Sequence, residues 1–253
     1  MMALQSSAAS SSAFPPTSVW VRWCLLAVVL SLQACATVAN PDRRDPLESM
    51  NRSIYGFNDR LDTALVKPVA TVYRDVTPSW FRAGVGNFFN NIEDVWSTVN
   101  NALQGRGDYA VDSAKRVAVN TTVGLLGTFD IASKMEIDKH PTNFGLTLGR
   151  WGVGPGPYVV LPLIGPTTLR DIAGMPVDRR GNLITYVDDE GTRTGATALN
   201  LLNLRATYLQ AGDVVDGAAL DKYSFMRDAY LQRQRNRVYD GNPPEEEESD
   251  PPK

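Results

Sequence analysis

The chain has 253 residues, of which 43% are hydrophobic and 21% are charged, and its formal net charge is −3. This length and composition suit one globular domain with a sizeable core. No basic stripe with interleaved aromatic residues occurs, so the sequence does not indicate a nucleic-acid partner.

Residues 1–34 have the order of a secretory signal peptide rather than of a folded element. An arginine precedes an apolar run at 23–32, which is shorter than the about 20 residues that a membrane-spanning helix needs. A small residue, Ala34, then precedes Cys35, as at a signal cleavage site. Because the Leu-Gln-Ala-Cys segment at 32–35 resembles a lipobox, we predict cleavage after Ala34 and lipid attachment to Cys35. A plain signal peptide that happens to end near a cysteine is the alternative.

The cysteine content agrees with a lipid anchor. Cys24 lies inside the predicted signal peptide and would be lost on cleavage, which leaves Cys35 without a disulfide partner in the mature chain. The next residue is Ala36 and not the aspartate that tends to retain lipoproteins at the inner membrane. We therefore expect a lipoprotein on the periplasmic face of the outer membrane, with residues 35–44 as the linker from the anchor.

The body of the chain, residues 45–239, is predicted to be one mainly α-helical domain. Apolar residues recur at steps of three or four over 45–68, and Pro68 should break or kink this helix. A second helix with a wide apolar face is expected over 88–103, and a less marked one over 108–125. Because no segment of the predicted mature chain has 18 consecutive apolar residues, we expect no conventional membrane-spanning helix.

The middle of the domain has a different composition. Gly145–Gly174 contains many glycine and proline residues around a Tyr-Val-Val-Leu-Pro-Leu-Ile segment at 158–164. Glycine and proline at this density break helices and strands, so we expect loops, turns and short extended pieces that could pair as a hairpin. A long irregular segment inside a compact domain is usually functional.

The C-terminal residues 240–253 form an acidic, proline-rich tail that includes Glu245–Glu248. With little apolar surface to bury, this tail should be disordered. The chain's excess of acid lies here, and it therefore gives no argument for a basic partner of the domain.

Catalytic groups are scarce in this sequence. His140 is the single histidine, so any Ser-His-Asp or Cys-His arrangement would have to use it, and no Gly-x-Ser-x-Gly elbow is present. Asp188-Asp189-Glu190 lacks the spacing of a calcium loop, and the glycines at 152–156 lead into no helix with the lysine or serine of a phosphate-binding loop. We therefore expect binding or transport rather than an enzyme, with no metal and no cofactor.

Polar residues interrupt the apolar helices, and two hypotheses explain them. They are ordinary solvent-facing residues, or the helices form a ring with lipid outside and a polar lumen inside. In the second case, a wide apolar face such as Phe88, Phe89, Ile92 and Trp96 would contact acyl chains. The polar residues are Asn51, Arg52, Asn58 and Asp59, then Asn90, Asn91, Asn100 and Asn101, and later Asn200, Asn203 and Arg205.

Short motifs follow one another between Asp45 and Asp178, with a looser continuation to about Tyr230. The most specific lies at 156–171, where Gly-Pro-Tyr-Val-Val-Leu-Pro is followed by Gly-Pro and then by Arg-Asp. The others are DPLESMNR at 45–52, FN at 57–58, KPVA at 67–70, RAGVGNFFNN at 82–91, NNALQG at 100–105 and FGLTLG at 144–149. In this order the motifs resemble those of the MlaA (VacJ-like) phospholipid-transport lipoprotein family.

The resemblance implies a ring-like bundle of amphipathic helices, a Gly/Pro-rich loop or short hairpin, and a position in the inner leaflet of the outer membrane. Such a lipoprotein removes mislocalised phospholipid from the outer leaflet through an amphipathic channel. It works beside an outer-membrane porin trimer and passes the lipid to a soluble, MlaC-like periplasmic carrier. The rivals are a porin-associated or envelope scaffold without lipid transport, and a lipid hydrolase that depends on His140.

We place the candidate site in the Gly/Pro-rich segment, as the channel mouth or its gate, because non-helical backbone is allowed at membrane depth where it lines a cavity. Replacing Gly154 and Gly156 by alanine should then impair lipid removal. The candidate ring-shaping residues are Asn51, Arg52, Asn87 and Phe88. The candidate channel or gating residues are Gly145, Gly152, Gly154, Gly156, Pro157, Tyr158, Pro162, Arg170 and Asp171.

Overall fold

The computed structural model describes residues 42–245, and the predicted signal peptide, Cys35 and most of the acidic tail lie outside the described residues. The described part is mainly α-helical with one two-stranded sheet, as predicted. Its elements are α2 (Glu48–Leu61), a π-helical turn (Asp62–Val66), α3 (Lys67–Val76), α4 (Ser79–Leu103), α5 (Gly107–Thr122), α6 (Ile131–Lys134), α7 (Phe144–Arg150), β1 (Tyr158–Leu161), β2 (Gly165–Thr168), α8 (Leu169–Gly181), a 3-10 turn (Leu183–Tyr186), α9 (Glu190–Thr207), α10 (Leu209–Ala218) and α11 (Lys222–Val238).

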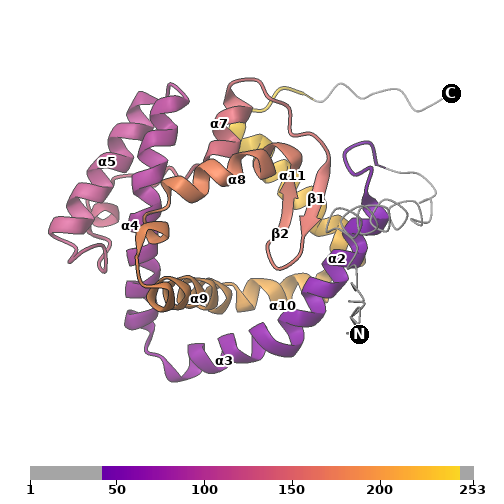
Figure 1. Cartoon of the computed structure of the whole chain (residues 1–253), viewed down its shortest axis with the longest axis horizontal. Helices are drawn as coiled ribbons and strands as arrows, with labels where there is room; N and C mark the ends of the chain where they lie inside the picture. Colours follow the sequence, from indigo (N-terminus) through magenta and orange to yellow (C-terminus); the bar gives the residue numbers. More distant parts are fainter. Residues whose placement is uncertain (1–41, 246–253) are drawn as a thin grey trace, which may run out of the picture. The chain divides into compact units, whose positions relative to one another are not determined.

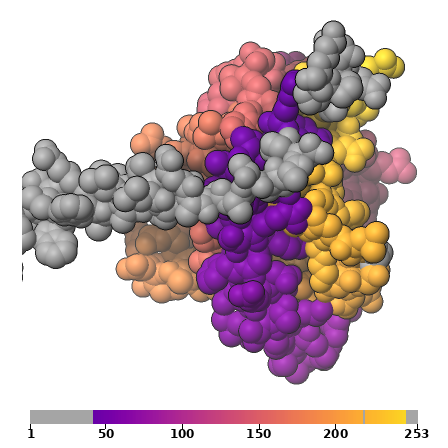
Figure 2. Space-filling view, turned by 90° about the vertical axis from the view of Figure 1, so that its right-hand side faces the viewer, coloured from indigo at the N-terminus to yellow at the C-terminus, as the bar shows by residue number. Residues whose placement is uncertain are grey.

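The elements of this unit follow one another around a ring (Figure 1). α3 and α4 both contact α9, α4 also contacts α7, and α7 contacts both α8 and α11. The β-hairpin then joins the two ends, because β2 contacts α11 and β1 contacts α2. Figure 2 shows this junction from the side, with the indigo and purple α2 and α3 beside the amber and yellow α10 and α11.

Of the break or kink predicted at Pro68, the break is wrong. Pro68 lies in the first turn of α3, directly after the π-helical turn Asp62–Val66. A π-helical turn widens the backbone, which relieves the clash of a proline ring with the preceding turn. The irregularity therefore precedes the proline, and the helix runs on to Val76, just before Thr77-Pro78.

Two further boundaries differ from the prediction. α4 starts at Ser79 rather than Phe88, and α5 ends at Thr122 rather than Leu125. Leu125 has a φ of 51°, a left-handed conformation that cannot continue a helix. Both ends of Gly145–Gly174 are helical, so the irregular backbone is confined to a shorter loop, and the hairpin is confirmed.

The contacts between α4 and α5 are mostly polar. Along α4 the buried residues are Gly84, Asn91, Asp94, Ser97, Asn100 and Asn101. Asn91 donates to the hydroxyl of Thr121 at 2.9 Å, and Asn101 donates to the hydroxyl of Ser113 at 3.2 Å. Side-chain hydrogen bonds thus fill the place that an apolar core usually takes between two helices.

Arg116 of α5 is the centre of this network and is only 2% exposed. Its Nε donates to Asp94 at 3.1 Å, one terminal nitrogen donates to Ser133 and to the Ile137 carbonyl, and the other reaches both oxygens of Asp130 at 3.1 Å. Burial raises the pKa of Asp94. Hydrogen bonds from Ser133 and Arg116 outweigh burial at Asp130 and lower its pKa to about 2.

We predict that Arg116→Met destabilises the fold by about 3–5 kcal/mol, because it removes the guanidinium that is hydrogen-bonded to buried Asp94. Lys115→Met is the control, since the exposed Lys115 pairs with Asp112 at 3.3 Å on the surface and should contribute less than about 1 kcal/mol. Urea unfolding in detergent, followed by circular dichroism, measures both variants. Equal stabilities for the two would contradict the central position of Arg116.

Candidate functional site

The hairpin has short paired strands and an exposed apolar tip. Tyr158 pairs with Thr168 and Leu161 pairs with Gly165 in an antiparallel ladder. The connection between the strands presents Leu163 and Ile164, which are 73% and 66% exposed. In Figure 1 the hairpin lies along the inner side of the ring, so this apolar tip belongs to the inner side as well.

Two asparagines of α2, two helical turns apart, hold the free edge of β1. Asn51 donates to the Tyr158 carbonyl at 3.0 Å and accepts from the Val160 amide at 2.8 Å. Asn58 does the same further along the strand: it donates to the carbonyl of Leu161 at 3.0 Å and accepts from the backbone amide of Leu163 in the turn that follows. An unpaired strand edge needs hydrogen-bond partners, and these amides supply them in place of a third strand.

A buried polar cluster adjoins Asn51. Asp45 is fully buried and accepts hydrogen bonds from the Asn51 amide at 2.7 Å and from the hydroxyl of Tyr223. Arg227 lies 3.5 Å from the same carboxylate. Burial and the bond to Asp45 raise the pKa of Tyr223, which therefore stays a hydrogen-bond donor.

Arg52, whose side chain is partly exposed, adds further contacts at the same junction. It pairs with Glu48 and with Asp221, each at 2.7 Å, and its guanidinium lies 4.4 Å above the Tyr223 ring. Residues from the start of the described chain are thereby joined to α11. Of the predicted ring-shaping residues, Asn51 and Arg52 thus lie where the ring closes.

Asn87 and Phe88 lie elsewhere, on α4. Asn87 donates to the Thr128 carbonyl at 3.1 Å and so holds the turn after α5 against α4. Phe88 packs edge-to-face on Phe89, with 5.4 Å between the ring centroids, and is 38% exposed. The structure therefore separates the four predicted ring-shaping residues into two places.

The glycine-rich loop, residues 151–157, leads from α7 into β1. Its Pro155 and Pro157 carbonyls accept hydrogen bonds from the first amides of α8, both at 3.1 Å. Gly156 has a φ of +65°, and a Cβ there would lie 3.1 Å from the Leu169 Cβ. A Cβ on Gly154 would meet nothing within 4 Å. The loop is fixed at its two prolines, and it is open just before them, at Gly154.

A cavity of about 810 Å³ lies between this loop and α11. That volume is in the range of small-molecule sites. Of the predicted site residues, Gly152, Gly154, Gly156 and Arg170 line it. Apolar side chains of α11, including Leu231 and Val238, line it from the other side.

The remaining predicted residues do not line this cavity. A Cβ on Gly145 would be 2.5 Å from Asp171, which shows how closely α7 crosses α8. Asp171 accepts a hydrogen bond from Tyr230 at 2.8 Å. Tyr158 is fully buried. Pro157 begins the hairpin and exposed Pro162 starts its tip.

Sequence reasoning missed the partners of the α2 asparagines. Asn58 was noted as a polar residue on an apolar helix, which is the signal that could have identified it. Tyr223 and Arg227 gave no comparable signal, because their contact with Asp45 joins distant parts of the chain.

Large apolar side chains are exposed on the outer elements. Val76 and Trp80, at the corner between α3 and α4, are 74% and 73% exposed, and Leu125 and Leu126 are 65% and 68% exposed. No helix among residues 42–245 is long and apolar enough to cross a membrane. The described unit is thus a helical ring with polar contacts between α4 and α5, an apolar cluster between α3, α9 and α10, and several exposed apolar side chains.

A family model described as MlaA lipoprotein matches residues 43–237. A protein of Escherichia coli (strain K12), named intermembrane phospholipid transport system lipoprotein MlaA, is 37% identical over 196 residues, which cover 76% of this chain and 77% of that protein. A protein of the same name from Haemophilus influenzae is 31% identical over 234 residues, covering 88% of this chain and 92% of that protein. This chain belongs to the MlaA lipoprotein family, which confirms the resemblance found in its motifs.

A solved structure shares the fold. It comes from a study of the structural basis for maintenance of bacterial outer membrane lipid asymmetry, and it matches with a TM-score of 0.69 and 34% sequence identity. The match covers 79% of this chain and 100% of that one. The mainly α-helical fold class is therefore confirmed.

We predict that Asn58→Leu frees the hairpin tip without unfolding the ring. The change removes two hydrogen bonds, together about 1–3 kcal/mol, and should speed amide exchange over residues 161–164 by roughly fivefold or more. Ser53→Ala is the control, because the Ser53 hydroxyl bonds only within α2, to the Ser49 carbonyl. Exchange measured by mass spectrometry that is unchanged in Asn58→Leu would show that the tip is held by other contacts.

Proposed function

We propose that this protein is an outer-membrane lipoprotein that removes mislocalised phospholipid from the outer leaflet and passes it to a soluble periplasmic carrier. The observation that carries the proposal is membership of a family whose named relatives are intermembrane phospholipid transport system lipoproteins. In this proposal Cys35 carries the lipid anchor, an outer-membrane porin trimer is the neighbour, and the carrier resembles MlaC. No catalytic step is involved.

The distribution of polar and apolar side chains supports a place in one leaflet. Buried asparagines of α4 contact other helices, while Val76, Trp80, Leu125 and Leu126 are exposed. Burying apolar surface in acyl chains stabilises such an exterior by about 25 cal/mol per Å². A ring that lies in the inner leaflet and is held by the anchor would bury these apolar side chains without a membrane-spanning helix.

A polar path through the ring would ease the passage of a headgroup. Moving a charged group through hydrocarbon is costly, because the group loses its water. A route lined with polar groups reduces that cost for the headgroup, while the acyl chains stay in an apolar environment. In the proposal, the loop at 151–157 and the hairpin form or gate the mouth of this route, with the cavity beside Gly152, Gly154, Gly156 and Arg170 as part of it.

Deletion of the protein should cause phospholipid to accumulate in the outer leaflet, because removal from that leaflet would stop. Labelling of surface-exposed phospholipid in deleted and complemented cells measures this. A Cys35→Ala protein should fail to complement, since it lacks the anchor. Unchanged outer-leaflet phospholipid in the deletion strain would contradict the proposal.

The two rivals have separate tests in the same assay. A scaffold needs no lipid, so phospholipid that co-purifies with the mature protein counts against it. A hydrolase needs the single imidazole, whose ring stacks on Tyr109 with 3.9 Å between centroids and whose Nε2 lies 3.6 Å from Asp112. Complementation by His140→Ala would count against a histidine-dependent enzyme.

Gly156→Ala should slow lipid removal several-fold, because alanine is strained at a φ of +65° and its methyl group would press on Leu169. Gly154→Ala adds the same methyl group in open space and should have a smaller effect. Both proteins should remain membrane-bound, which fractionation checks. Normal lipid removal by Gly156→Ala would exclude this loop from the route.

A further inference from the structure

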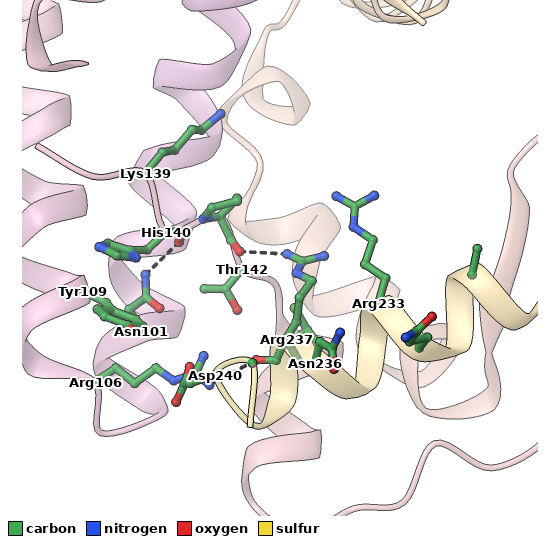
Figure 3. Close-up of a pocket in the computed structure, with 15 residues that line it drawn as sticks. Asn101, Arg106, Tyr109, Lys139, His140, Thr142, Arg233, Asn236, Arg237 and Asp240 are labelled. Carbon is green, nitrogen blue, oxygen red and sulfur yellow. Dashed lines mark hydrogen bonds and ion pairs between the residues drawn. The ribbon is translucent and has the colours of Figure 1, made fainter. Parts of the chain in front are cut away.

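A second pocket, of about 720 Å³, lies on the other side of α11 and collects positive charge. It is bounded by the end of α4, the loop at 139–142 and α11 (Figure 3). Lys139, Arg233 and Arg237 line it, together with Arg106. The acid in its lining is Asp240, so the cations outnumber it.

The acid does not neutralise the cations that face the open part of the pocket. Asp240 pairs with Arg106 at 2.5 Å and lies 3.5 Å from Arg150. Lys139 and Arg233, by contrast, have no hydrogen bond or ion pair within residues 42–245. The charge of Lys139 also acts on buried Asp94, so the positive charge that the pocket presents without an acidic partner is that of Arg233.

The walls of the pocket are held in place by hydrogen bonds. Arg237 donates to the Pro141 carbonyl at 2.8 Å, which fixes the loop to α11. Asn101 of α4 donates to the His140 carbonyl at 3.0 Å, which fixes the same loop to α4. In Figure 3, Arg233 and Arg237 extend from α11 on one side of the pocket, and Lys139 extends from the loop on the other side, apart from both guanidinium groups.

This arrangement of cations opposes folding unless an anion joins it. Arg233 and Arg237 are one turn apart on α11, where like charges repel. Burial, together with the charge of Arg233, lowers the pKa of Arg237. Each guanidinium can bind two oxygens, so the pair on α11 matches the several oxygens of a phosphate group better than the two oxygens of a carboxylate. Gln232 and Asn236 add amide donors to the lining.

We propose that this pocket binds a phosphate group, carried by a lipid headgroup or by a small soluble phosphate. The site is separate from the cavity beside the glycine-rich loop, although α11 contributes to both. If the phosphate belongs to a lipid headgroup, the pocket is a headgroup site of the proposed lipid route and rests on that function. If it is soluble, the pocket is a ligand site independent of transport.

Calorimetric titration of the full-length lipoprotein in uncharged detergent tests the proposal with inorganic phosphate, glycerophosphoglycerol and acetate. We expect one of the two phosphate probes to bind, and the tighter probe identifies the source. The double variant Lys139→Gln/Arg233→Gln should bind it about tenfold more weakly. The control Lys134→Gln/Arg179→Gln has the same change in net charge on exposed residues outside the pocket and should bind as the native protein does.

The proposal is overturned if neither phosphate probe binds, if acetate binds as tightly, or if the control loses as much affinity as the pocket variant. Lipid removal in cells, measured for the same proteins, keeps the two proposals apart. Normal lipid removal without phosphate binding overturns the proposed phosphate site and leaves the proposed function standing. Phosphate binding by a protein that removes no lipid supports the pocket and counts against the proposed function.

Discussion

The fold depends on buried hydrogen bonds between helices in the place where most domains of this size have an apolar core. Arg116 is the clearest case, because its guanidinium joins α4, α5 and the segment after α5 through Asp94, Asp130 and Ser133. Such contacts are directional, and each buried polar group needs its partner. They hold helices at fixed angles and leave the apolar side chains free to face outwards.

An exterior of this kind suits a protein whose surroundings are partly hydrocarbon. The exposed Trp80 and Leu126 would be unfavourable in water, where a large apolar patch promotes association. Among acyl chains the same surface is favourable, and hydrogen bonds inside the ring lose nothing to competing water. The buried polar contacts and the exposed apolar side chains would therefore both suit the membrane position that we propose.

Much of the fold could be predicted from the sequence. The apolar periodicity gave α2 and most of α4, and the density of glycine and proline located the loop and hairpin between α7 and α8. The start of α4 was missed because Gly84 and Gly86, residues of low helix propensity, interrupt its apolar stripe of Phe81, Val85 and Phe88. It is held by tertiary contacts, including Arg82, which donates to carbonyls at the end of α3. Such contacts leave no local pattern in the sequence.

Less of the candidate site than of the fold could be predicted from the sequence. Four of the predicted channel residues line one cavity, because short-range turn chemistry fixes a glycine-rich loop. Asn51 and Asn58 could be recognised as unusual, but their partners lie more than a hundred positions away in β1. The basic pocket combines α4, a loop and α11, and no periodicity in any one of them indicates the others.

The junction of Asp45 and Arg52 with α11 has a consequence for how the chain folds. Asp45 is fully buried by groups that include Tyr223, 178 positions later in the sequence. Contacts of such long range form slowly, because a large loop must close first. Asp45 and Arg52 can therefore pair early with Asn51 and Glu48, but they have no partner from α11 until the last helix has been synthesised. Until then the Asp45 carboxylate and the Arg52 guanidinium remain accessible to water, and the ring stays open at this junction.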